Sequence, residues 1–208
     1  QSGGILVDHM IKFAQQGVGM AKAVSIGNKA FIKEKELLSY LAKDPATKVI
    51  SYYIEGLGGG EGRDFVLAAD CCHKPVVIMK SGKTAAGNRA VSSHTASLAG
   101  DYASFSAAVA QHNILEAADE HELVSFCEVL SSYTNPIQGN IGIITGSGGH
   151  GAMAVDACSL NGINVPELSD TVREEIRKNL KDQIKTIATL GNPVDLTGSA
   201  MDEDFVAC

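Results

Sequence analysis

Residues 75–100 read PVVIMKSGKTAAGNRAVSSHTASLAG, and this stretch decides the fold class. The apolar run from Pro75 to Met79 is typical of a short strand buried on both faces of a parallel sheet. The Gly/Ser/Ala-rich segment from Ser81 to Gly100 shows no apolar period, which predicts a long loop. A loop of this length without structure of its own is usually functional or disordered. The stretch therefore predicts a parallel sheet that presents a long loop at the end of a strand.

One histidine near the far end of this loop, His94, is the first candidate catalytic residue. Near neutral pH an imidazole readily accepts and passes on a phosphoryl group or a proton. The alternative is a histidine that only caps or fills a turn. Spacing alone does not decide between the two interpretations.

The flanking sequence alternates predicted helices with predicted strands. In the first half, helices are expected at 5–15, 34–41, 64–71 and 102–111, and strands at 23–26, 48–54 and 76–79. This alternation predicts right-handed βαβ units and an α/β fold on a parallel sheet. Ligands of such sheets bind at the carboxyl ends of the strands, so residues that directly follow a strand are the first to consider for a site.

A domain boundary is predicted within residues 115–138, where Asn135-Pro136 breaks the chain after a helix expected at 120–131. We place the first domain at residues 1–130 and the second at 131–208. The second domain begins with another strand, glycine loop and helix. With only about 70 residues it is small for a complete doubly wound domain, so we expect its remaining strands beyond the end of this sequence.

Composition indicates an ordinary globular protein of 208 residues, with 45% hydrophobic residues and 22 glycines. A net charge of −7 without a Lys/Arg cluster argues against a nucleic-acid or anionic-membrane partner. No stretch approaches the roughly 18 apolar residues of a membrane span. Anionic ligands would therefore be held by local backbone N–H groups.

Five cysteines without a C-x-x-C pair predict a reduced, cytoplasmic protein. The sequence has neither a signal-peptide pattern nor an initiator methionine, and we expect it to be a fragment of a longer polypeptide. We predict no metal site, because four histidines lack metal-ligand spacing: His9, His73, His112 and His121.

Two glycine-rich helix starts are candidate phosphate-binding sites: Ser2-Gly3-Gly4 and Gly148-Gly149. A helix N-terminus presents unpaired N–H groups and about half a positive charge, and glycine lets a phosphate approach closely. An ordinary N-cap is the alternative for Ser2.

The second glycine segment also satisfies G-x-G-x-x-G at 146–151, with Glu167 about 20 residues further on. A dinucleotide-binding module therefore stays open as an alternative.

Glu55 follows a predicted strand and is the candidate partner of His94. A carboxylate bonded to one ring nitrogen fixes the tautomer and leaves the other nitrogen free to attack. The alternative is a surface glutamate in a turn. Lys83 and Arg89 stay open between phosphate contacts and ordinary loop positions, and Lys29 between facing the substrate and forming a turn.

The loop at 81–100 resembles the phosphohistidine loop of the NDP-forming acyl-CoA synthetases, the superfamily that includes succinyl-CoA synthetase. Five further motifs match that family in order: QSGG (1–4), VSIGNK (24–29), YIEG (53–56), TGSGGHG (145–151) and NPVDLT (192–197). The resemblance implies two flavodoxin-like, succinyl-CoA synthetase-like parallel-sheet domains, the second incomplete.

The resemblance also implies an acid–thiol ligase that interconverts acyl-CoA, ADP and phosphate with a free acid, CoA and ATP. His94 would carry the phosphoryl group and Glu55 would orient its ring. The helix starts at Ser2–Gly4 and Gly148–Gly149 would hold the phosphate, and the loop would then swing His94 to the nucleotide.

The family's remaining elements are expected elsewhere: a CoA-binding domain before Gln1, and an ATP-grasp domain on this polypeptide or on a partner chain. CoA, the nucleotide and its Mg²⁺ would bind largely there, within an oligomer, so this fragment alone should be inactive. A synthetase-like regulatory module of a protein lysine acetyltransferase is the alternative. The intact SSHT motif at 92–95 argues against it.

Overall fold

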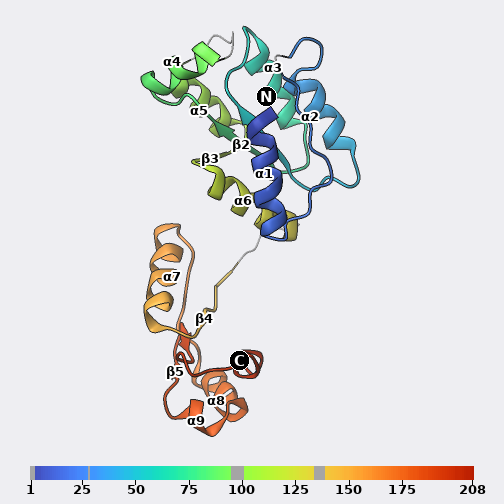
Figure 1. Ribbon diagram of the computed structural model, residues 1–208. Coiled ribbons are helices and arrows are strands. Elements are labelled where there is room, and N and C mark those ends of the chain that lie inside the picture. The colour runs from blue at the N-terminus through green and yellow to red at the C-terminus, as the bar shows by residue number, and fades with distance from the viewer. Residues whose placement is uncertain (1–2, 28, 95–100, 134–138) are drawn as a thin grey trace. The chain divides into compact units, whose positions relative to one another are not determined.

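A computed structural model describes residues 3–27, 29–94, 101–133 and 139–208, with only the backbone given for residues 92–94 (Figure 1). The chain divides into two compact units, Gln1–Asn135 and Pro136–Cys208. Each unit is described by itself.

The first unit is built on a parallel sheet with the strand order β1-β2-β3. Its strands are β1 (Ile50–Ile54), β2 (Val76–Lys80) and β3 (Leu115–Ala117). Every residue of the central strand β2 is buried, because helices cover both faces of the sheet. The predicted parallel α/β architecture is confirmed for this unit.

Six helices belong to the described part of the first unit (Figure 1): α1 (Gly3–Gln15), α2 (Glu34–Lys43), α3 (Glu61–Asp70), α4 (Ala85–His94), α5 (Tyr102–Gln111) and α6 (Glu120–Ser132). Helices α2, α3 and α5 pack on one face of the sheet through Leu38, Phe65 and Val109. Helices α1 and α6 cover the other face through Phe13 and Leu123. None of the described helices is long and apolar enough to cross a membrane.

The second unit carries a smaller sheet of short strands, β4 (Ile144–Thr145), β5 (Thr189–Leu190) and β6 (Val194–Asp195). Its order is β4-β6-β5, with β4 parallel and β5 antiparallel to β6. The helices are α7 (Gly148–Leu160), α8 (Asp170–Asn179), α9 (Asp182–Lys185) and α10 (Asp202–Val206). The unit is α/β as expected, but its sheet is mixed, because β5 and β6 form a hairpin.

The most consequential difference from the sequence prediction concerns the loop expected at 81–100, because residues 85–94 form α4. Thr84 starts this helix: its Oγ1 accepts from the Gly87 N–H at 3.0 Å and its carbonyl from Asn88 at 2.7 Å. Alanine is the strongest helix former, so propensity and an N-terminal cap produce a helix without an apolar stripe. Residues 95–100 lie outside the described residues.

The predicted strand at 23–26 was wrong, because these residues join neither sheet of the described chain. The strands β3, β5 and β6 were not predicted. They contain only two or three residues, which is too few to show an alternating pattern.

Candidate functional site

The carboxyl edge of the first sheet brings together Glu55 and the root of the segment that leads to His94. Glu55 directly follows β1, and Ser81 directly follows β2. The last residues of the two strands, Ile54 and Lys80, are register partners, and Ser81 N donates to the Ile54 carbonyl at 3.0 Å. The strand ends therefore meet at one edge, as a parallel sheet requires.

Glu55 is 6% exposed and is paired with a tyrosine of its own strand. The Tyr53 hydroxyl donates to Glu55 Oε1 at 3.2 Å and lies 3.1 Å from Ser81 Oγ. Burial and the nearby Glu55 carboxylate raise the pKa of Tyr53, so its hydroxyl keeps the proton it donates. Sequence reasoning missed Tyr53, although residues two apart on a strand share a face.

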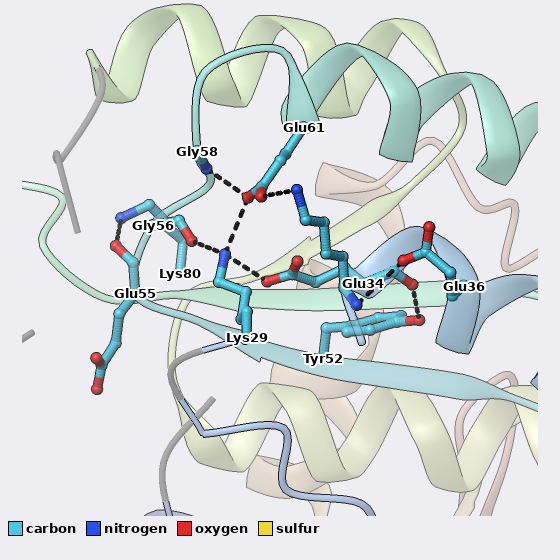
Figure 2. Close-up of polar contacts among 10 residues, drawn as sticks. Lys29, Glu34, Glu36, Tyr52, Glu55, Gly56, Gly58, Glu61 and Lys80 are labelled. Carbon is cyan, nitrogen blue, oxygen red and sulfur yellow. Dashed lines mark hydrogen bonds and ion pairs between the residues drawn. The ribbon is translucent and has the colours of Figure 1, made fainter. Parts of the chain in front are cut away.

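Two lysine ammonium groups hold the turn that carries Glu55 (Figure 2). Lys80 Nζ donates to the Glu55 carbonyl at 2.7 Å, and Lys29 Nζ donates to the Gly56 carbonyl at 2.9 Å. The lysines come from different segments: Lys80 ends β2, and Lys29 precedes α2. Two consecutive carbonyl groups of the turn are therefore tied to other segments of the unit.

Lys29 is also the centre of an ion-pair cluster (Figure 2), in which its Nζ lies 2.9 Å from Glu34 Oε1 and 3.3 Å from Glu61 Oε2. Glu61 further pairs with Lys33 at 3.0 Å and accepts from the Gly58 N–H at 2.6 Å. Lys33, then the Gly58 N–H and Lys29, lower the pKa of Glu61 to about 2. Of the two roles left open for Lys29, the structure shows the one in a turn.

His94 is the last residue of α4, and its side chain lies outside the described residues. The start of α4 is fixed by Lys83, whose Nζ lies 3.3 Å from the carbonyl oxygens of both Ala117 and Ala118 and 3.4 Å from Glu116 Oε1. Lys83 thus anchors the segment to the end of β3. Arg89 donates to the Ala85 carbonyl within the helix itself.

At the first predicted phosphate site, Gly3 and Gly4 lie in the first turn of α1, whereas Ser2 lies outside the described residues. Apart from its own helix backbone, a Cβ placed on Gly4 would meet no atom of the described residues within 4 Å. Farther along α1, His9 is buried and meets the Tyr53 ring edge-on, with 6.4 Å between ring centroids. Burial lowers the pKa of His9, a residue that sequence reasoning had considered only as a metal ligand.

At the second predicted phosphate site, Gly148 and Gly149 open α7. A Cβ on Gly148 would lie 2.9 Å from Asp195 Oδ2, and one on Gly151 would lie 3.1 Å from Pro193. The glycine loop therefore packs directly against the NPVDLT segment at 192–197. The Asp195 carboxylate lies beside Gly148, at the start of α7. A phosphate bound at this helix start would therefore lie close to a second negative charge.

The dinucleotide alternative finds no support in the geometry of the second unit. Glu167 pairs with Arg173 at 2.7 Å, and no strand lies between α7 and α8, a segment that the structure describes throughout. A ribose-binding acid is expected at the end of such a strand.

The described part of the chain holds no group of three His, Cys, Asp or Glu residues arranged for a metal ion.

A cavity of about 540 Å³ in the first unit lies between α1, β1 and residues 18–26. Its lining includes Ile5, Val24 and Tyr53 but not Glu55. We therefore place the candidate site at the carboxyl edge of the sheet, where Glu55 lies, rather than in this cavity.

Comparison with known proteins identifies the family of both units. The succinyl-CoA ligase like flavodoxin domain matches residues 1–130, and the Ligase-CoA domain matches residues 141–207. Acetate–CoA ligase [ADP-forming] I of Archaeoglobus fulgidus is 42% identical over 207 residues, which are 99% of this chain and 29% of that protein. The alpha subunit of acetate–CoA ligase [ADP-forming] II of Pyrococcus furiosus is 34% identical, over 99% of this chain and 44% of that subunit.

A solved structure shows the same relationship. Dinucleotide forming acetyl-coenzyme A synthetase 1 of Ca. Korarchaeum cryptofilum, in complex with phosphate and ADP, matches all of this chain with a TM-score of 0.85 and 34% identity. This chain covers 44% of that structure and thus spans less than half the length of the relatives described. The chain belongs to the family of the succinyl-CoA ligase like flavodoxin domain.

Proposed function

We propose that this chain is the phosphohistidine-bearing part of an NDP-forming acyl-CoA synthetase. The whole enzyme would interconvert acyl-CoA, ADP and phosphate with a free acid, CoA and ATP. The observation that carries the proposal is the buried Glu55 carboxylate, held by Tyr53 at the sheet edge from which the segment ending in His94 departs.

In the proposed reaction, phosphate displaces CoA from the acyl-CoA and forms an acyl phosphate. A ring nitrogen of His94 then attacks phosphorus, and the bond from phosphorus to the acyl oxygen breaks, so the free acid leaves. A terminal oxygen of ADP next attacks the same phosphorus, and the P–N bond breaks to give ATP. Besides the His94 nucleophile, this chain would contribute positioning and charge stabilisation, which dominate the catalysis of phosphoryl transfer.

The predicted site residues that the structure describes have the following roles in this scheme. Glu55 accepts the proton on the second ring nitrogen of His94, which fixes the tautomer and offsets the charge of the phosphorylated ring. The first turns of α1 at Gly3–Gly4 and of α7 at Gly148–Gly149 would each offer backbone N–H groups to a phosphate. Gly4 supports this role because, among the described residues, nothing blocks a close approach to its Cα.

CoA and the nucleotide with Mg²⁺ would be bound largely by a CoA-binding domain and an ATP-grasp domain or subunit outside this chain. The name "subunit alpha" of the Pyrococcus furiosus relative supports a partner chain. ADP and phosphate in the Ca. Korarchaeum cryptofilum structure support the nucleotide and the phosphate. Five free cysteines fit a reducing, cytoplasmic location.

The test is ATP formation by the intact protein that contains this chain, with its partner chain if the two are separate. The protein is mixed with ADP, phosphate, Mg²⁺ and a series of acyl-CoA thioesters, starting with acetyl-CoA. Thioester-dependent ATP formation that disappears in His94→Ala supports the proposal. Equal ATP formation by His94→Ala, or none with any thioester, would contradict it.

A further inference from the structure

We infer that Lys80 and Lys29 are positioning residues for Glu55: together they fix the two consecutive peptide groups on the C-terminal side of its Cα. This role rests on the proposed function of Glu55 as the partner of His94. Both contacts lie within normal hydrogen-bond distance, 2.7 Å to the Glu55 carbonyl and 2.9 Å to the Gly56 carbonyl.

Lys80 joins the two strand ends of the site. It is 6% exposed, and its Nζ donates to the Glu55 carbonyl after β1 and to the Ser81 carbonyl after β2. The same ammonium lies 6.0 Å from the centroid of the Phe105 ring on α5. One buried cation therefore ties the Glu55 turn to the backbone from which the His94 segment begins.

Lys29 fixes the next peptide group and is itself held in place by two acids (Figure 2). Its side chain is 11% exposed and lies between the Glu34 and Glu61 carboxylates. Because both acids belong to the starts of helices, α2 and α3, the Gly56 carbonyl is tied to two rigid elements.

These contacts matter because the chain immediately after Glu55 is rich in glycine. Residue 56 is a glycine, which has more backbone freedom than any other residue, and Gly58 to Gly60 lie close behind it. The two ammonium donors restrict the peptide planes on both sides of Gly56. Tyr53 fixes the far end of the Glu55 side chain, and the lysines fix its backbone end.

A double-mutant cycle with Glu55→Gln separates positioning from general stability. The intact protein is labelled with [γ-³²P]ATP and Mg²⁺, and the rate of acid-labile, alkali-stable labelling is measured for Lys80→Met, Glu55→Gln and the double variant. We expect Lys80→Met to slow labelling on the order of 10–100-fold, because a small misplacement of a reacting group has effects of this size. In the Glu55→Gln background the same change should cost no more than about twofold, the usual error of additivity.

Lys74→Met is the matched control. Lys74 precedes β2, and its Nζ donates to two backbone carbonyls, those of Leu41 and Asp44. Its loss removes the same kind of contact without touching the Glu55 turn. The effect of Lys74→Met on labelling, whatever its size, should be equal in the wild-type and Glu55→Gln backgrounds.

Equal slowing by Lys80→Met in both backgrounds would overturn the inference and leave Lys80 a purely structural residue. If circular dichroism shows that Lys80→Met does not fold, Lys80→Arg replaces it in the cycle, because a guanidinium keeps the charge but has a different shape. Labelling of both Lys80→Arg and Lys29→Arg at the wild-type rate would also overturn it. Absence of label on the wild type would instead refute the proposed function, and the positioning role with it.

Discussion

Replacing Lys29 by methionine should destabilise the first unit by about 3–5 kcal/mol at pH 7, the usual cost of removing one partner of a buried ion pair. Three contacts are lost, to the Gly56 carbonyl, Glu34 and Glu61. Glu61 keeps its pairing with Lys33, so most of the loss comes from Glu34. The Glu34 side chain is only 3% exposed, and Lys29 supplies the ion pair that the structure shows for it.

The cause of this loss of stability can be tested by also removing the Glu34 carboxylate, which Lys29→Met leaves without its ion-pair partner. Adding Glu34→Gln to Lys29→Met should recover a large part of the lost stability, because a buried amide is less costly than a buried carboxylate. Urea unfolding followed by circular dichroism at 222 nm measures both changes. A loss below about 1 kcal/mol for Lys29→Met, or no recovery in the double variant, would refute the reasoning that Lys29 neutralises a buried acid.

Two further predictions concern Glu61 and the glycine loop of the second unit. Glu61 has a pKa of about 2 in the folded protein against an ordinary value of 4.5, so its stabilisation is complete above pH 4.5 and is lost as the pH falls toward 2. Glu61→Gln should therefore be less stable than wild type by about 1–2 kcal/mol at pH 7 after allowance for solvent screening, and urea midpoints of the two proteins should converge toward pH 2. In the second unit, Gly148→Ala should be destabilising, because its Cβ would lie 2.9 Å from Asp195 Oδ2, whereas Gly149→Ala has 3.9 Å to the nearest atom and should be neutral or stabilising by up to about 1 kcal/mol. Thermal unfolding compares the stability of the two variants. Equal changes in both would show that the contact with Asp195 does not determine the cost of Gly148→Ala.

The sequence predicts helix positions well where local interactions, such as an N-cap, determine where a helix begins. Helix α5 occupies the predicted residues 102–111, and its start is capped by the Asp101 side chain, which accepts from Ser104 N. Ser169 caps α8 in the same way, with its side chain accepting from Val172 N. Helix α4 was missed because the prediction relied on an apolar period, whereas a Thr84 cap and alanine propensity produce this helix.

The sequence predicts only part of the site, because some of its residues contact each other across a long stretch of sequence. Glu55 was found because it follows a strand, and every strand end is a candidate position in a parallel sheet. The lysines that hold its turn lie 25 and 27 residues from the carbonyls they bind, and no local pattern encodes such contacts. One signal was available: Lys80 closes a strand that is otherwise wholly apolar, and a buried lysine needs a partner.

The most direct test of the proposed function is the chemical state of His94 during turnover. The intact protein, with its partner chain if the two are separate, is incubated with labelled ATP and Mg²⁺, and wild type is compared with His94→Ala. We predict an acid-labile, alkali-stable label on the wild type, as expected of a phosphoramidate, and none on His94→Ala. Equal labelling of both proteins, or no label on a wild type that contains an intact ATP-grasp domain, would contradict the phosphohistidine mechanism.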